Sequence, residues 1–134
     1  MAAPTTAWSR FVDDLRVEGP HGPLFAGFLV YDAQGKVQLA EGWFTDANGA
    51  ATKALFAAAT DDTMSRHTVV LRSYAFQIIR NEYGNFAAVA HHRKLGLLTQ
   101  RCGVAVVAAI VAWPYTVQTT FATMEAFGHR LRSA

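Results

Sequence analysis

The chain has 134 residues, of which 51% are hydrophobic and 16% are charged, and its formal net charge at pH 7 is +2. A chain of this length suits one domain with a core of its own, and it is too rich in apolar residues to be intrinsically disordered. The small net charge gives no argument for nucleic acid as a partner, and the single cysteine, Cys102, excludes an internal disulfide framework and fits a reducing compartment.

The first predicted element is an amphipathic helix over residues 7–15. Four apolar side chains recur there at i, i+3, i+4 and i+7, namely Trp8, Phe11, Val12 and Leu15. This spacing places them on one stripe of a helix, which must lie against another part of the fold. Its aromatic rings are either all buried in the fold or partly offered to a partner.

A β-hairpin and a second helix follow along the chain. After a proline-containing loop at 20–23, residues 24–31 predict a strand and residues 32–35 predict a type I turn. Residues 36–40 should pair back on that strand as a hairpin. Residues 48–59 are rich in alanine and other strong helix formers, so we expect a helix there.

The second half of the chain predicts a meander of short strands followed by a helix. Short gaps between the strands favour antiparallel pairing. The last helix is expected at 117–132, where apolar residues keep helical spacing. If the two terminal helices lie side by side on one face of the sheet, the aromatic residues of the first come close to Phe127 and Leu131. The expected strands are 67–71, 74–80, 85–92, 97–101 and 103–113, with a hairpin turn at 81–85.

The longest apolar run, at 103–113, predicts a buried strand rather than a membrane span. A helix that crosses a bilayer needs about 20 residues, and this run is shorter and rich in β-branched residues. Pro114 should end the strand because proline cannot donate to a β-ladder. No secretory signal opens the chain. We therefore expect a cytoplasmic protein that is not transmembrane.

The order of helix, hairpin, helix, meander and helix resembles that of the profilin family. Profilins open with a tryptophan, an aromatic residue three positions later and an aliphatic–Asp–x–Leu continuation. The same pattern stands here at Trp8, Phe11, Val12, Asp13 and Leu15. Further similarities to the family are found at 26–37, Phe44, 74–80 and 104–114 and in the closing helix.

The resemblance covers nearly the whole chain and implies one profilin-like domain over residues 1–134. It implies an α+β fold with a central antiparallel β-sheet. The N- and C-terminal helices would pack on one face of this sheet, and a smaller helical layer would cover the other. It also implies three kinds of partner, which are monomeric actin, proline-rich peptides and phosphoinositides.

The proline-rich-peptide site that the resemblance implies is incomplete in this sequence. Its matching positions are Trp8, Phe11, Arg130 and Leu131. Phe11 lacks the hydroxyl of the tyrosine that is common there, Arg130 replaces a histidine or tyrosine, and Gln38 replaces a second tryptophan. The alternative is that Trp8 and Phe11 only seal the first helix onto the sheet.

The actin-binding surface implied by the resemblance lies on the middle strands and the start of the last helix. Ala75 and Ala122 stand where a charge is expected in the family. Such charges would steer association and set orientation. For Arg80, the alternative is a solvated charge at a strand end. The matching positions are Arg66, Ile78, Arg80, Tyr115, Phe121 and Glu125.

The most basic local cluster is His91, His92, Arg93 and Lys94, which the resemblance relates to phosphoinositide headgroups. The alternative is a solvated turn with scattered positive charge. A metal site is not expected there. His91 and His92 would point to opposite faces of a strand, and no Cys/His spacing completes a zinc set.

No catalytic motif or cofactor-binding motif appears in the sequence. Cys102 lies beside an apolar strand with no partner motif, and neither a phosphate-binding glycine loop nor a GxSxG nucleophile motif is present. We therefore expect a non-enzymatic protein without a cofactor.

The resemblance favours a protein that binds actin monomers and regulates actin assembly, with a weakened site for proline-rich peptides. One alternative is an adaptor of the same fold that binds another protein or phosphoinositides without actin. A second alternative is a small-molecule sensor domain, which would need a central cavity.

Overall fold

The computed structural model describes residues 10–45, 49–61, 67–82 and 85–133. Its helical elements are the 3-10 turn η1 (Asp13–Leu15) and the helices α2 (Gly49–Ala59) and α3 (Val117–Ser133). Its strands are β1 (Glu18–Gly19), β2 (Gly22–Pro23), β3 (Gly27–Asp32), β4 (Val37–Gly42), β5 (Thr68–Leu71), β6 (Tyr74–Glu82), β7 (Asn85–Ala90), β8 (Leu95–Arg101) and β9 (Ala105–Ala112).

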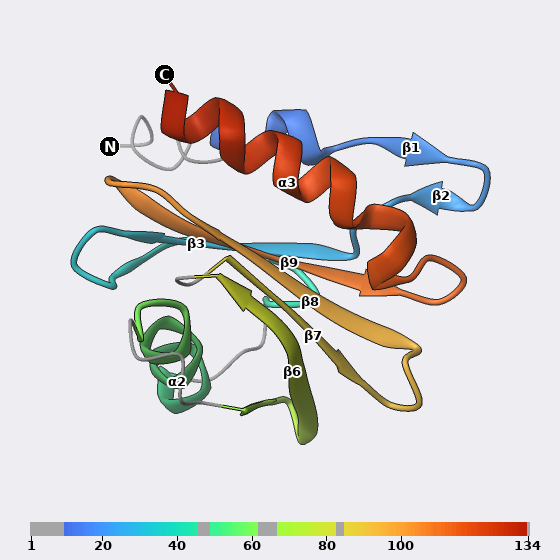
Figure 1. Cartoon of the computed structure of the whole chain (residues 1–134), viewed down its shortest axis with the longest axis horizontal. Helices are drawn as coiled ribbons and strands as arrows, with labels where there is room; N and C mark the ends of the chain where they lie inside the picture. Colours follow the sequence, from blue (N-terminus) through green and yellow to red (C-terminus); the bar gives the residue numbers. More distant parts are fainter. Residues whose placement is uncertain (1–9, 46–48, 62–66, 83–84, 134) are drawn as a thin grey trace.

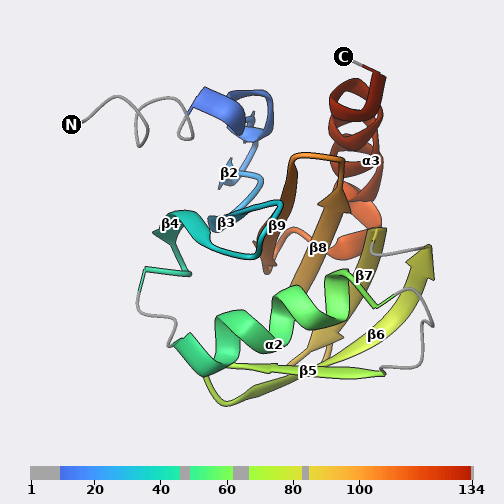
Figure 2. The same ribbon diagram turned by 90° about the vertical axis from the view of Figure 1, so that its left-hand side faces the viewer.

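Seven strands form one antiparallel sheet in the order β4-β3-β9-β8-β7-β6-β5. The helix α3 and the η1 segment cover one face of this sheet, and α2 lies under the other (Figures 1 and 2). The predicted α+β architecture with two helical layers is confirmed.

Strand β9 shows why the sheet needs a layer on each side. Its side chains alternate between two buried clusters, because successive residues of a strand point to opposite faces. Val107 and Val111 join the cluster under α3, whereas Val106 and Ile110 join the cluster that faces α2. Both faces of β9 are buried, and its sequence is therefore an uninterrupted apolar run.

The helix α2 is anchored to the sheet through an aromatic pair. The rings of Tyr31 on β3 and Phe56 on α2 lie with their centroids 5.1 Å apart. The Tyr31 hydroxyl donates to the Thr52 carbonyl at 2.5 Å. Burial raises the pKa of this phenol above its ordinary value, so it remains a neutral donor over the physiological range.

A glycine allows α3 to approach the sheet closely. Gly128 is buried, and a Cβ placed there would meet the side chain of Gln100 on β8. The absence of a side chain therefore fixes the depth at which the C-terminal half of α3 rests on the sheet.

The N-terminal segment and α3 lie side by side, as predicted. The rings of Phe11 and Phe127 meet edge to face with their centroids 6.4 Å apart. Helical backbone at residues 10–11 passes into η1, and the prediction for residues 7–9, including Trp8, lies outside the described residues.

Two segments differ from their predictions in backbone shape. The strand predicted at 85–92 ends at Ala90, because His91, His92 and Arg93 adopt positive φ values of 53°, 55° and 65°. These residues form a tight left-handed turn into β8, which is entered at Leu95, two residues before the predicted start. The loop predicted at 20–23 contributes to the small β1–β2 hairpin.

Candidate functional site

The helix α3 covers only part of the sheet face on which it packs. Beyond α3, strands β5 and β6 and the edge of β7 remain open, and their side chains line a groove of about 370 Å³. Ile79 lines this groove with 48% of its surface exposed. We call this surface the open face and define it by Thr68, Val70, Ala75, Gln77, Ile79 and Val89.

A β-bulge in β6 determines which residues reach the open face. Ile78 is opposite Ala88 and Arg80 is opposite Ala87, so Ile79 is the extra residue on this strand. Ile78 packs against the cluster that faces α2, on the other side of the sheet. Ile78, which we expected on the actin-binding surface, is therefore not on the open face, where Ile79 lies instead, a residue that sequence reasoning missed.

The same bulge turns Arg80 towards α3. Its guanidinium lies over the ring of Phe121, with the central carbon 4.7 Å from the ring centroid. Its Nη2 also contacts Glu82 Oε1 at 2.9 Å. Phe121 and Glu125 are one turn apart on α3, and both line a hollow of about 70 Å³ together with Arg80. Three of the residues assigned to the actin surface are thus brought together.

Tyr115, which was also assigned to that surface, is not part of this group. The Tyr115 hydroxyl accepts a hydrogen bond from the His21 N–H at 2.8 Å and donates one to the Gly22 carbonyl at 2.9 Å. Its phenol therefore ties the β1–β2 hairpin to the start of α3. Arg66 lies outside the described residues.

The seam between the N-terminal segment and α3 holds three of the residues assigned to peptide binding. Phe11 and Leu131 are half-buried against the same apolar cluster. Arg130 is exposed, and its Nε lies 3.4 Å from Asp14 Oδ2. Gln38, which stands in place of an aromatic residue, donates from its Nε2 to Asp32 Oδ2 at 2.9 Å.

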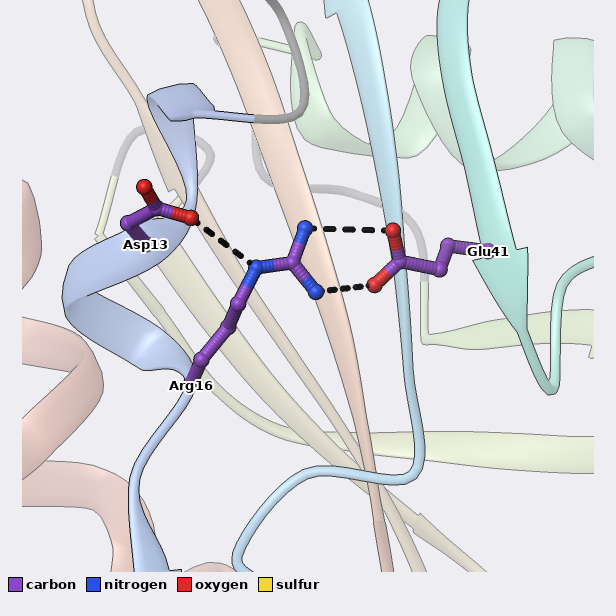
Figure 3. Close-up of polar contacts among 3 residues, drawn as sticks. All are labelled: Asp13, Arg16 and Glu41. Carbon is purple, nitrogen blue, oxygen red and sulfur yellow. Dashed lines mark hydrogen bonds and ion pairs between the residues drawn. The ribbon is translucent and has the colours of Figure 1, made fainter. Parts of the chain in front are cut away.

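An arginine clamp ties the N-terminal segment to the edge strand β4 (Figure 3). Arg16 makes a two-point contact with the carboxylate of Glu41 and contacts Asp13 Oδ1 at 3.0 Å. Its guanidinium carbon also lies 5.5 Å from the ring centroid of Phe28. The hydrogen bond with Glu41 is the main cause that raises the pKa of Arg16. Sequence reasoning missed this clamp because 25 positions separate Arg16 and Glu41.

The basic turn of His91, His92, Arg93 and Lys94 is exposed along its whole length. Aromatic residues cluster at this end of the sheet. The rings of His91 and Tyr74 are 5.8 Å apart, and the exposed Trp113 donates its backbone N–H to the Lys94 carbonyl at 2.9 Å. Because these histidines belong to a turn, the strand-based expectation that they point to opposite faces does not apply.

The described part of the chain offers no cluster of three or more metal-ligating side chains. Nor does any helix in that part have the length and apolar character needed to cross a bilayer.

The comparisons with known proteins give no match by sequence but several matches by fold. No protein-family model matches the sequence, and no curated protein does. LokiProfilin1 aligns with a TM-score of 0.74 and 11% identity, over 96% of this chain and 97% of its own. LokiProfilin2 in its complex with rabbit actin aligns with a TM-score of 0.70 and 10% identity, over 95% and 96%. Profilin II of Acanthamoeba castellanii aligns with a TM-score of 0.62 and 16% identity, over 82% and 86%. The chain therefore has the profilin fold.

Proposed function

We propose that this chain is a divergent, profilin-type protein that binds monomeric actin through the open face and regulates actin assembly. The observation that carries the proposal is the exposed Ile79 beside the Arg80–Phe121 stack, on the part of the sheet that α3 leaves uncovered. The likeness to LokiProfilin2, whose structure was solved in complex with rabbit actin, supports the choice of partner.

The chemistry of this surface suits a protein partner. An apolar centre with a rim of charge is the usual anatomy of such interfaces. Ile79 and Val70 supply apolar area, and the stacked Arg80 offers a cation whose position is fixed by Phe121. The mechanism would be stoichiometric, since bound protein covers part of the actin monomer and so blocks or redirects its assembly. This activity would place the protein in the cytoplasm with the cytoskeleton.

The test is calorimetric titration of monomeric rabbit actin with the full chain and two matched variants. Ile79→Asp adds a carboxylate to the middle of the open face and should weaken binding at least about tenfold, because a buried, unpaired charge is costly. Val104→Asp makes the same change at a 63% exposed valine in the β8–β9 turn and should leave binding unchanged. Absence of binding at roughly 50 µM actin would refute the proposal.

We further propose that the seam is a weak site for proline-rich peptides. Phe11 and Leu131 offer apolar surface there, and Arg130 lies beside them. A polyproline II helix docks on exposed aromatic rings, and Phe11 is already engaged edge to face with Phe127. Polyproline should therefore bind only at millimolar concentration in calorimetry, and Phe11→Ala should abolish the heat signal. Binding at low micromolar concentration would contradict a weakened site.

A second candidate function is association with phosphoinositide headgroups through the basic turn. Four exposed basic or titratable side chains in one left-handed turn, next to the exposed Trp113, favour it. Vesicles that contain phosphatidylinositol bisphosphate should co-sediment the wild type but not Arg93→Glu/Lys94→Glu. If lipid binding persists while actin binding is absent, the adaptor alternative replaces the first proposal.

A further inference from the structure

The strand β5 forms one edge of the seven-stranded sheet, and in the described part of the chain it pairs only with β6. A two-residue turn joins the two strands, with positive φ values of 49° at Arg72 and 69° at Ser73, as a type I′ hairpin requires. An edge strand presents backbone N–H and C=O groups to which another strand can be added. The side of β5 that faces away from β6 is therefore a candidate docking edge.

The hydrogen bonds of the hairpin identify which groups of β5 point outwards. The Ile78 N–H donates to the His67 carbonyl at 2.8 Å, so these two residues form a hydrogen-bonded pair. Such pairs alternate along an antiparallel ladder, so Val69 is also bonded to β6. The backbone groups of Thr68 and Val70 therefore point away from β6, and within the described ranges no other group is hydrogen-bonded to them.

The two edges of the sheet differ in their protection against the addition of a strand. Native edge strands are commonly protected by charged side chains, by proline or by a β-bulge. In β4 the register shifts at Gln38, and Glu41 carries a charge to which Arg16 is bound. The strand β5 (Thr68–Leu71) has neither a charged residue nor a proline, and its register with β6 is unbroken. Its Val70 is 55% exposed. Of the two edges, β5 is therefore the one that a further strand can join.

A second copy of β5 matches this edge in one antiparallel register. When Thr68 lies opposite Val70 of the second copy, Val70 lies opposite Thr68 of that copy, and the two-fold axis passes between the two Val69 residues. Both opposite pairs then consist of residues whose backbone groups point outwards, so each pair exchanges two hydrogen bonds. Thr68 and Val70 are both exposed and share one face of the sheet, so β-branched side chains meet across the joint.

We propose that the chain forms a weak, symmetric homodimer through antiparallel pairing of β5 with β5 of a second copy, which continues the sheet across the two-fold axis. The strand has only 4 residues, and a joint of this length buries less than the roughly 800 Å² per partner of a standard interface. The dissociation constant should therefore be about 0.2 mM. This inference does not rest on the proposed actin binding.

Sedimentation velocity and amide hydrogen exchange test the proposal on the full chain. Between about 10 µM and about 1 mM protein, the weight-average mass should rise from that of the monomer towards that of the dimer. Over the same range, protection of the Thr68 and Val70 amides from exchange should increase at least about twofold, whereas the Val69 amide is already bonded to β6 and should change less. A monomer mass at 1 mM, or a dimer without this added protection, would overturn the proposal.

Matched variants locate the joint. Thr68→Pro removes an outward N–H that β6 does not use and should abolish dimerisation, and Val70→Lys should raise the dissociation constant at least about tenfold. Val104→Lys makes the same change at a 63% exposed valine in the β8–β9 turn and should leave the constant unchanged, as should Ile79→Asp on the open face. Equal effects of the two lysine variants, or loss of the dimer in Ile79→Asp but not in Val70→Lys, would contradict edge pairing. The exchange measurement on the wild type decides the matter even if Thr68→Pro fails to fold.

Discussion

The arginine clamp allows one prediction to be worked out from its geometry. Arg16 and Glu41 keep only 34% and 35% of their side-chain surfaces exposed, and they share a two-point contact. Exposed ion pairs contribute about 0.2–1 kcal/mol, and partial burial with bidentate geometry places this pair at the upper end, near 1 kcal/mol. The position of Arg16 over Phe28 adds about 0.5 kcal/mol.

The assay is a double-mutant cycle in chemical denaturation with Arg16→Met and Glu41→Gln. Methionine keeps apolar bulk over Phe28, so the cycle isolates the ion pair. We expect Arg16→Met alone to lower the free energy of unfolding by about 1–1.5 kcal/mol and the coupling energy to be about 1 kcal/mol. For a chain of 134 residues, each kcal/mol corresponds to a change in melting temperature of about 3–4 °C.

The control is the pair of Arg80 and Glu82, which has the same chemistry in a more exposed setting. Their side chains are 49% and 62% exposed and share one contact at 2.9 Å. A cycle with Arg80→Met and Glu82→Gln should give a coupling energy of about 0.3 kcal/mol or less. Equal coupling energies in the two cycles, or a value near zero for the clamp, would refute the reasoning from burial and two-point geometry.

Three further predictions concern stability. Hydrogen bonds from Lys36, Gln34 and Gln38 lower the pKa of Asp32, so its contribution is present above the ordinary value of 3.8 and is lost as the pH falls through the lowered pKa. Asp32→Asn should therefore show a shallower loss of melting temperature on acidification below pH 4, and an unchanged slope would contradict this. Phe76 is fully buried, and Phe76→Ala should cost about 3–5 kcal/mol in chemical denaturation; a cost below 1 kcal/mol would show that the cluster facing α2 is loosely packed. Tyr115→Phe should lower the free energy of unfolding by about 1 kcal/mol because the hydroxyl makes two hydrogen bonds to adjacent residues of the β1–β2 hairpin, and faster amide exchange at the His21 N–H should accompany it.

The architecture could be predicted from the sequence where periodicity and burial agree. The apolar run that becomes β9 is buried on both faces, and the stripe containing Phe11 does lie against Phe127. In both cases the pattern depends on the hydrophobic effect, which acts over whole elements and therefore requires a regular pattern of apolar residues in the sequence.

The details of the surface could not be predicted in the same way. The bulge at Ile79 shifts by one residue which side chains of β6 point to each face of the sheet, and no local sequence propensity predicts it. The left-handed turn from His91 to Arg93 uses residues without the glycine that such backbone usually favours. The clamp between Arg16 and Glu41 joins positions that only the folded sheet brings together. Each of these features costs or gains about 1 kcal/mol, too little to govern the pattern of a whole element.

This difference in scale explains how the fold matches LokiProfilin1 at a TM-score of 0.74 with only 11% sequence identity. Many combinations of apolar residues fill a core of given volume, so the architecture survives wide replacement in the interior. Binding depends on few residues at a surface, where one substitution removes most of the affinity. Retention of the fold therefore carries little information about retention of a partner. Ile79 and Arg93 both line the groove on the open face, whereas Phe11 lies at the seam. Since distant sites contribute independently, a variant at Phe11 should leave the activities proposed for Ile79 and Arg93 unchanged, and loss of all three activities in one variant would point to unfolding instead.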